Sequence, residues 1–288
     1  MKDLKGKTAF ITGGASGIGL AMAEAFGREG MNVMIADIEA GALKAAVEAL
    51  RAKQVRAEGV LCDVTSRGAV RAAALETLAK FGKVHVVCNN AGVGGGGPLG
   101  SVLEGDWDWV IDVNLKGVVY GVETFAPLIE SHGEGGWFVN TASMAGMVSP
   151  PGMEPYCATK FAVVAMSEGW ARQLEAKNIG VSILCPGFVK TRIDESRRNR
   201  PSAYGADAPA ARPEGPSLVQ SGIPAEAVGA RVVEGVKDGD LYIFTHPEFK
   251  GATQARFDRI LEAFDKSATS PAIRALGERT VPGLNLAE

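Results

Sequence analysis

A tyrosine and a lysine have the spacing that acid–base chemistry requires. Tyr156 and Lys160 are four residues apart in Tyr-Cys-Ala-Thr-Lys, at the start of a stretch with helical periodicity. Side chains at positions i and i+4 share one face of a helix, so the phenol and the ammonium can interact. A free phenol has a pKa of ~10, but a nearby cation favours its ionised form. The pair is a candidate for exchanging a proton with an alcohol or a ketone, although isolated pairs with this spacing are also common on surfaces.

Two polar residues upstream support that chemistry. Ser143 follows a predicted strand, where its hydroxyl can hold a substrate oxygen against Tyr156. A turn-forming serine is the alternative. Asn114 lies inside a predicted helix, although asparagine is a poor helix former, and this favours a functional role such as binding a water that links Lys160 to solvent.

A glycine-rich segment near the N-terminus has the form of a phosphate-binding turn. Residues 12–19 read Thr-Gly-Gly-Ala-Ser-Gly-Ile-Gly and lie between a predicted strand and a predicted helix. Glycines let the backbone turn tightly, approach a pyrophosphate and present amide N–H groups at a helix start. A tight turn without a ligand is the alternative. The predicted dinucleotide contacts in this segment are Gly13, Ser16, Gly17, Ile18 and Gly19.

Asp37 ends the second predicted strand, 18 residues after the last glycine of that segment. A carboxylate there can accept hydrogen bonds from the ribose hydroxyls of NAD, and it repels the 2′-phosphate of NADP. No basic residue stands at Ala15, Ser16 or Ile38 to bind that phosphate. Glu39 adds a second negative charge, so the prediction is NAD. A helix N-cap is a compatible second role for Asp37.

Two later strand ends belong to the same edge of the predicted sheet. Asp63 follows the third strand, where it can contact a ligand or, equally, cap the helix that begins near Ser66. Asn89-Asn90-Ala91-Gly92 follows the fourth strand, and its small residues allow a nucleotide to lie against the backbone. By itself this segment is also compatible with a plain turn.

Short β-branched runs alternate with alanine-rich stretches through the first 190 residues, which is typical of βαβ units. We therefore predict an α/β fold, a Rossmann-type doubly wound parallel sheet, with residues 1–288 in a single domain. The predicted strands are Thr8–Thr12, Asn32–Ala36, Arg56–Cys62, Val84–Cys88, Gly136–Thr141 and Val181–Cys185. The predicted helices are Gly17–Glu29, Ala40–Lys53, Ser66–Phe81, Trp107–Ser131 and Tyr156–Lys177.

The chain changes character after Thr191. Residues 192–222 are rich in Arg, Pro, Ala and Ser without clear periodicity, and we interpret them as a substrate lid. A helix at Pro224–Lys237 and a strand at Leu241–Phe244 follow. Residues 245–288 are predicted to form a C-terminal helical extension, with a helix at Pro247–Lys266 and a packed or swapped tail.

Composition excludes several classes of protein. The formal net charge of −3 provides no broad attraction to nucleic acid or to anionic lipid. The sequence has neither a signal-peptide pattern nor an apolar run long enough to span a membrane, so we expect a cytoplasmic protein. The four cysteines lack metal-site spacing and are expected to be buried thiols. The three histidines are scattered along the sequence, so no metal site is predicted.

The ordered set TGGASGIG, NNAG, Asn114, Ser143, YCATK and PGFVKT resembles the short-chain dehydrogenase/reductase family over about residues 5–192. The resemblance implies a catalytic tetrad, with Tyr156 as acid and base and with Lys160 also holding the nicotinamide ribose. It also implies assembly as a homo-oligomer, a tetramer or a dimer, through the two long helices. His85 departs from the family, which often has an acidic residue there. The further cofactor contacts that it implies are Asp63, Val64, Asn90, Ala91, Gly92, Pro186, Gly187, Val189 and Thr191.

The C-terminal region is similar to dehydrogenases that oxidise the benzylic alcohol of lignin-derived aryl ethers. This suggests a hydrophobic or aromatic secondary alcohol lined by Met144, Met147, Met153 and lid residues, unless these methionines fill core gaps. The glycine run at 94–97 either makes room for such a substrate or is a flexible linker. Four arginines of the lid either recognise a carboxylate or form a solvated helix face: Arg192, Arg197, Arg198 and Arg200.

The leading functional hypothesis is NAD-dependent oxidation of a secondary alcohol to a ketone. A carbonyl reductase that uses the same residues is the first alternative. A non-catalytic nucleotide-binding scaffold is the second, and the presence of all four tetrad residues argues against it.

Overall fold

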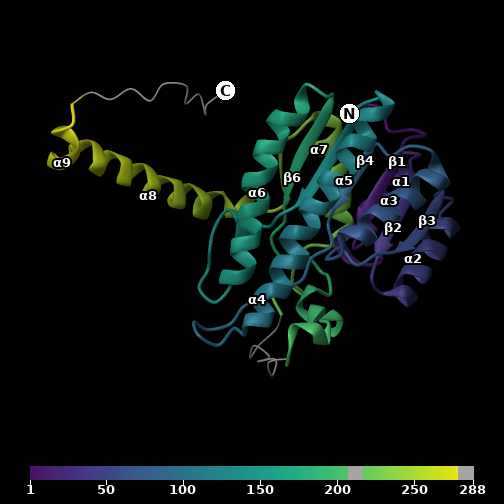
Figure 1. Cartoon of the computed structure of the whole chain (residues 1–288), viewed down its shortest axis with the longest axis horizontal. Coiled ribbons are helices and arrows are strands. Elements are labelled where there is room, and N and C mark those ends of the chain that lie inside the picture. Colours follow the sequence, from purple (N-terminus) through teal and green to yellow (C-terminus); the bar gives the residue numbers. More distant parts are fainter. Residues whose placement is uncertain (207–216, 278–288) are drawn as a thin grey trace. The chain divides into compact units, whose positions relative to one another are not determined.

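The computed structural model describes residues 1–206 and 217–277. The chain divides into two compact units, Met1–His246 and Pro247–Glu288. The first unit contains the sheet and its covering helices, together with every predicted site residue (Figure 1).

The first unit is built around a seven-stranded sheet in the order β3-β2-β1-β4-β5-β6-β7. Neighbouring strands are parallel throughout, which confirms the predicted fold class. The order reverses between β1 and β4, and ligands of open α/β sheets bind at the carboxyl ends of the strands beside such a reversal. The strands are β1 (Thr8–Thr12), β2 (Asn32–Asp37), β3 (Ala57–Leu61), β4 (Val86–Asn89), β5 (Gly136–Thr141), β6 (Ile179–Cys185) and β7 (Tyr242–Phe244).

Helices cover both faces of the sheet, so its strands are buried on both sides. All five residues of β1 are buried, and they alternate between two cores. Ile11 packs in the core beneath α1, α2 and α7, whereas Phe10 packs in the core beneath α3, α5 and α6, with its ring centroid 4.5 Å from that of Phe125. These helices are α1 (Gly17–Arg28), α2 (Ala40–Ala52), α3 (Arg67–Phe81), α5 (Gly117–His132), α6 (Glu154–Glu175) and α7 (Ala225–Asp238).

The predicted helix Trp107–Ser131 is interrupted in the structure. It consists of α4 (Glu104–Ile111), a π-helical turn at Asp112–Lys116 and then α5. Asn114 lies in the π-helical turn. Such wide turns occur often at functional sites because they move a side chain out of regular helical register. Helical periodicity predicts the length of such a segment but not this local change of hydrogen bonding.

The predicted lid begins with two short 3-10 helices, Ile193–Asn199 and Ser202–Tyr204. A parallel bridge between Val189 and Ile223 closes the base of this long connection. Residues 207–216, in the middle of the predicted lid, lie outside the described residues.

The second unit contains α8 (Lys250–Thr269) and α9 (Pro271–Arg274). The helix predicted at Pro247–Lys266 corresponds to α8, which has no buried residue. The final part of the predicted tail, residues 278–288, lies outside the described residues. Among residues 1–206 and 217–277, none of the helices is both long enough and apolar enough to cross a bilayer.

Candidate active site

The glycine turn joins β1 directly to α1 and packs against the end of β4. A Cβ on Gly13 would stand 2.9 Å from the Cα atom of Ala91, and one on Gly19 would stand 2.1 Å from the carbonyl oxygen of Gly13. Only glycine therefore allows this close approach. Ser16 precedes α1 without making a side-chain capping bond, so the helix N-terminus keeps N–H groups for an anion. The turn fits the pyrophosphate of a dinucleotide.

Thr12 connects this turn to the segment that follows β4. Its hydroxyl accepts hydrogen bonds from the N–H groups of Asn90 and Ala91, at 2.9 and 3.0 Å. The amide of Asn90 donates to the carbonyl oxygen of Thr12 at 3.0 Å. Sequence reasoning missed Thr12, because a threonine at the end of a strand has no distinctive spacing. These bonds hold the two walls of the predicted dinucleotide site together.

Asp37 lies at the end of β2 and faces the glycine turn. One carboxylate oxygen accepts a hydrogen bond from the N–H of Ala15 at 3.0 Å, and the other accepts one from the N–H of Glu39 at 3.0 Å. The second bond pairs the N–H of Glu39, the residue that precedes α2, so Asp37 binds backbone at the start of this helix without being its N-cap residue. Each oxygen has a further lone pair, so the carboxylate still fits a ribose diol.

Asp63 binds the residues that follow it. Its Oδ1 accepts hydrogen bonds from the N–H and the hydroxyl of Thr65, at 2.9 and 2.8 Å. The cap of α3 is Ser66, whose side chain accepts from the N–H of Ala69, so the capping alternative for Asp63 is wrong. Val64 is buried in a small apolar cluster beside the crevice, together with Val93, Trp109, Val110 and Val113.

Tyr156 and Lys160 lie in the first two turns of α6, beside the end of β5. The Lys160 ammonium nitrogen is 5.4 Å from the centre of the Tyr156 ring. It donates a hydrogen bond to the carbonyl oxygen of Thr141 at 2.9 Å, and only 3% of Lys160 is exposed. Ser143 hydrogen-bonds to Tyr156 through its side chain. The structure therefore brings together the three polar side chains that the spacing indicated.

Close packing brings Ser143 next to α6. The hydroxyl oxygen of Ser143 accepts from the N–H of Ala145 at 3.1 Å and lies 3.4 Å from the carbonyl oxygen of Pro186. Gly146 follows in the same 3-10 turn, and a Cβ there would stand 2.8 Å from the carbonyl oxygen of Lys160. A larger residue at this position would push the serine away from the phenol.

Burial dominates the ionisation of both catalytic candidates. It raises the pKa of Tyr156 to about 12, and the hydrogen bond from Ser143 opposes that rise. It lowers the pKa of Lys160 to about 8. In the protein alone, desolvation of the phenol outweighs the predicted effect of the Lys160 cation, so the pKa of Tyr156 lies above its ordinary value. A positive nicotinamide next to the phenol would act in the opposite direction.

Asn114 is fully buried and positions the segment after β4. Its side-chain oxygen accepts from the N–H of Val93 at 2.8 Å, and its amide donates to the carbonyl oxygen of Val93 at 2.9 Å. A Cβ on Gly92 would stand 3.3 Å from that side-chain oxygen and 3.7 Å from the ammonium nitrogen of Lys160. The Asn114 side chain thus binds backbone through both of its polar atoms. Each atom keeps one further hydrogen-bonding position, so a bound water that links Lys160 to solvent stays a prediction.

The segment after β6 is fixed by a histidine far away in sequence. A Cβ on Gly187 would stand 2.8 Å from the His246 ring, whose Nδ1 accepts from the N–H of Gly187 at 3.1 Å. The Nε2 atom of His246 donates to the carbonyl oxygen of Phe188 at 3.0 Å. Val189 is buried, and the Thr191 side chain lies against Gly17 at the start of α1. Sequence reasoning gave His246 no role, because only the fold brings it to this segment.

The two remaining histidines meet at the opposite edge of the sheet, although they are far apart in sequence. Ligand atoms of His85, His132 and Glu134 lie within 4.8 Å of one another. The Nδ1 atom of His85 accepts from the N–H of Thr8 at 3.1 Å, and that of His132 accepts from the N–H of Glu134 at 3.2 Å. The Nε2 atom of His85 therefore carries the proton and donates to Glu134 at 2.9 Å. The cluster is a hydrogen-bonded network in which both ring lone pairs are used.

Several interpretations of the substrate side change in the structure. Met144 and Met147 are buried, which favours gap filling for these two, whereas Met153 is exposed. The glycine run is closely packed, since a Cβ on Gly95 would stand 2.4 Å from Val110 and one on Gly96 would stand 2.3 Å from a backbone oxygen. It is therefore not a flexible linker.

As predicted, all four cysteines are buried: Cys62, Cys88, Cys157 and Cys185.

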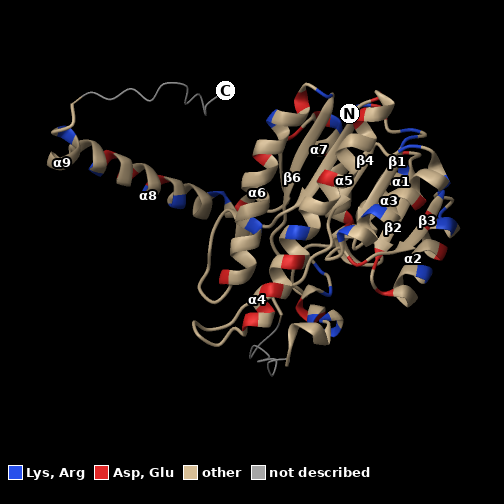
Figure 2. Cartoon of the chain, viewed as in Figure 1, with Lys and Arg blue, Asp and Glu red and all other residues tan. Residues whose placement is uncertain are grey.

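The four arginines of the lid are paired with carboxylates of this chain. Arg192 pairs with Glu195, Arg198 with Glu39, and both Arg197 and Arg200 with Asp106, at 2.6 to 2.9 Å. In Figure 2, ribbon coloured blue for Lys and Arg lies next to ribbon coloured red for Asp and Glu in this region. The exposed pair of Arg192 and Glu195 agrees with the solvated-face alternative, whereas Arg200 is buried against Asp106 and does not.

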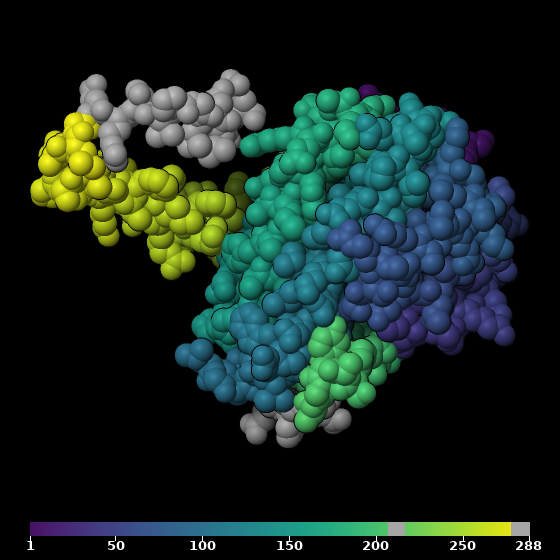
Figure 3. Space-filling view, viewed as in Figure 1, coloured from purple at the N-terminus to yellow at the C-terminus, as the bar shows by residue number. Residues whose placement is uncertain are grey.

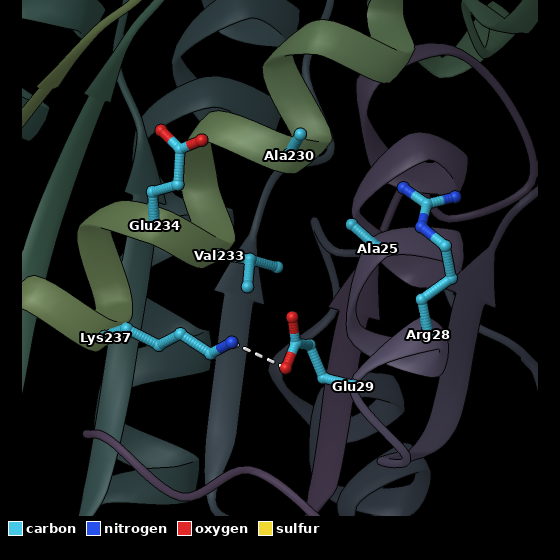
Figure 4. A pocket seen from close by; sticks show the side chains of 7 residues that line it. All are labelled: Ala25, Arg28, Glu29, Ala230, Val233, Glu234 and Lys237. Carbon is cyan, nitrogen blue, oxygen red and sulfur yellow. Dashed lines mark hydrogen bonds and ion pairs between the residues drawn. The ribbon is translucent and has the colours of Figure 1, made fainter.

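A separate pocket lies between α1 and α7 and includes none of the predicted site residues (Figure 4). Its lining includes the ion pair of Glu29 and Lys237, whose charged atoms are 2.6 Å apart.

Comparison with known proteins identifies the family to which this arrangement of residues belongs. The family model for short chain dehydrogenase matches residues 7–202. The chain belongs to the short-chain dehydrogenase family. It is therefore an oxidoreductase that acts on CH–OH groups.

Individual short-chain dehydrogenases are similar over most of this chain. The Cα-dehydrogenase of Sphingobium sp. is 35% identical over 276 residues, covering 94% of this chain and 90% of that protein. The CLA biosynthesis dehydrogenase/reductase of Lactiplantibacillus plantarum is 33% identical over 272 residues, covering 91% and 95%. A short-chain dehydrogenase/reductase from Burkholderia phymatum, solved in complex with NAD, superposes with a TM-score of 0.86 at 38% identity, covering 91% and 97%. The first of these agrees with the resemblance of the C-terminal region.

Proposed function

We propose that this short-chain dehydrogenase oxidises a hydrophobic or aromatic secondary alcohol to a ketone with NAD, and catalyses the reverse reaction through the same residues. One observation carries the proposal. The phenol of Tyr156 is hydrogen-bonded to Ser143 and lies 5.4 Å, measured at its ring centre, from the buried ammonium of Lys160. This group stands at the carboxyl edge of the sheet, where the uncapped N-terminus of α1 also lies.

The chain's own residues handle the proton. Ser143 donates to the substrate oxygen and holds it beside Tyr156. The ionised phenol takes the hydroxyl proton as the C–O bond gains double-bond character. The hydride from the same carbon goes to NAD, which supplies that acceptor when bound. Lys160 stabilises the phenolate and binds the nicotinamide ribose. Asn114 keeps the segment after β4 in place.

The proposed cofactor is NAD. Asp37 binds the adenosine ribose, and its charge disfavours NADP. The NAD complex of the Burkholderia relative supports this choice. The remaining proposed contacts are Gly13, Ser16, Gly17, Ile18, Gly19, Asp63, Val64, Asn90, Ala91, Gly92, Pro186, Gly187, Val189 and Thr191.

An apolar substrate is supported by the surface next to Tyr156. Met153 is exposed at 37% and precedes Tyr156 by three residues. The N–H of Gly97 donates to the carbonyl oxygen of Gly152 at 2.8 Å, which brings the glycine run to the same side. The name of the Sphingobium relative, Cα-dehydrogenase, supports dehydrogenation at a carbon atom as the reaction.

We further propose that the protein assembles as a dimer or a tetramer through α5 and α6. The two helices are long, at 16 and 22 residues. Light scattering on the purified protein tests this, and a monomer at micromolar concentration would contradict it.

Tyr156→Phe is the decisive test of the catalytic proposal. The variant loses only the phenolic oxygen, so alcohol-dependent formation of NADH should fall by at least about 1,000-fold. Binding of NADH, followed by its fluorescence, should remain within a few-fold of the wild type. Turnover within tenfold of the wild type would refute the role of Tyr156, and a wild type that binds no dinucleotide would refute the enzyme proposal as a whole.

A panel of aryl and alkyl secondary alcohols identifies the substrate class, and a preference for short polyols would contradict the apolar site.

A further inference from the structure

The segment of residues 192–204, here called the strap, crosses the region where the dinucleotide is proposed to bind. It begins next to the glycine turn, where the Thr191 side chain lies 3.0 Å from the position of a Cβ on Gly17. It then passes the segment after β4, where the hydroxyl of buried Ser196 accepts from the N–H of Gly94 at 3.0 Å. Gly17 follows β1 and Gly94 follows β4, the two strands at which the sheet order reverses. In Figure 3 the strap, in green, lies between the blue and the teal-blue segments.

Ion pairs hold the strap at two places. On the side of α4, Arg197 and Arg200 both bind the carboxylate of Asp106, at 2.9 and 2.8 Å. On the side of β2, Glu39 accepts on one oxygen from the guanidinium of Arg198 at 2.6 Å and from the amide of Asn199 at 2.8 Å. The second anchor matters for the cofactor, because it stands next to Asp37.

Glu39 and Asp37 form one acidic site. The N–H of Glu39 donates to Asp37 at 3.0 Å, and the other oxygen of Asp37 binds the glycine turn through Ala15. The Arg198 guanidinium therefore lies beside the position proposed for the adenosine ribose. A guanidinium is also the group that binds phosphate best, through paired N–H donors. In this chain its charge is opposed by Glu39, and its Nη1 atom donates to the carbonyl oxygen of Arg192 at 3.1 Å.

We propose that Glu39 is a second determinant of dinucleotide choice, because its pairing with Arg198 keeps that guanidinium from binding the 2′-phosphate of NADP. The inference rests on the proposed use of NAD. It assigns the strap a part in cofactor selection, in addition to its predicted role as a substrate lid. Asp37 repels the 2′-phosphate, and Glu39 neutralises the cation that would otherwise attract it.

Glu39→Gln tests the inference without any turnover. The substitution removes one negative charge while preserving the shape of the side chain and an acceptor for Arg198. Fluorescence titration should show NADPH binding about tenfold tighter than in the wild type, because a charge-assisted bond to phosphate becomes available. Binding of NADH should change less than about threefold. Glu39→Ala makes the same prediction if the glutamine variant does not fold.

Two further variants locate the effect. In Glu39→Gln/Arg198→Gln the gain in NADPH affinity should disappear, because the guanidinium is gone. Glu29→Gln is a charge-matched control, since Glu29 also forms a 2.6 Å ion pair, with Lys237, but between α1 and α7 (Figure 4). It should leave both affinities unchanged.

Each contrary result has a distinct meaning. Unchanged NADPH affinity in Glu39→Gln, or a gain that survives loss of Arg198, overturns the role of Glu39. If Asp37→Ala improves NADPH binding and Glu39→Gln does not, Asp37 sets the choice by itself, and the proposed function stands without this inference. If the wild type binds neither NADH nor NADPH, the proposed function fails, and the inference fails with it.

Discussion

Replacement of Lys160 by methionine tests how the buried cation assists the phenol. Methionine has a similar length and no charge, so it fills the same space beside Tyr156. The variant loses the hydrogen bond to Thr141 but also the cost of burying an ammonium group. We therefore expect a folded protein whose phenolate has lost its neighbouring cation.

The separation of the two groups sets the size of the effect. The ammonium nitrogen of Lys160 is 5.4 Å from the centre of the Tyr156 ring. Unit charges about that far apart interact by about 3 kcal/mol at an effective dielectric constant of ~20. One pKa unit corresponds to ~1.4 kcal/mol, so the loss amounts to about two units. At about pH 7 the variant should therefore have roughly 100-fold less phenolate and a kcat/KM about 100-fold lower.

The pH dependence has a definite direction. Burial lowers the pKa of Lys160 to about 8, so its charge is present below that pH and lost above it. The deficit of the variant should be largest below pH 8 and should shrink at higher pH, as the wild type loses the same cation. The assay is kcat/KM for alcohol oxidation at saturating NAD from about pH 6 to 10, with NADH affinity measured at each pH.

Lys177→Met is the matched control, because Lys177 follows α6 and makes an exposed ion pair with Glu130. It should change kcat/KM less than twofold. A Lys160→Met variant with the wild-type pH profile would refute the electrostatic argument. A deficit that is the same at every pH would indicate that Lys160 acts only by binding the cofactor.

Two further predictions concern stability. Asn114→Ala leaves the buried N–H and carbonyl groups of Val93 without partners, so urea denaturation should show a loss of about 2–5 kcal/mol, and a loss below about 1 kcal/mol would contradict the positioning role. Burial lowers the pKa of His85 despite its bond to Glu134, so the unfolded chain binds the proton more readily. The contribution of His85 to the free energy of unfolding should be fully present above about pH 6.5 and should decrease as the pH falls below that value, because a protonated His85 ring can no longer accept from the N–H of Thr8. Thermal unfolding from about pH 5 to 8 measures this, and a His85→Gln variant with the same pH slope as the wild type would rule it out.

Features that depend on nearby residues could be predicted from the sequence. Strands β1 and β5 have their predicted bounds, because a short run of apolar and β-branched residues predicts a buried strand from a few positions. The spacing of Tyr156 and Lys160 predicts a shared helix face, and the glycine turn predicts a strand followed by a helix. The parallel sheet follows from the alternation of these elements.

Contacts between distant residues were decided only by the tertiary structure. Glu39 meets Arg198 across 159 positions, and the N–H of Gly187 reaches the ring of His246 across 59. Neither pair has a spacing pattern, because the path of the chain between its elements determines which side chains meet. The ionisation of Tyr156 is a further case. Local spacing indicated the cation, but the pKa depends on how completely the folded chain excludes water from the phenol.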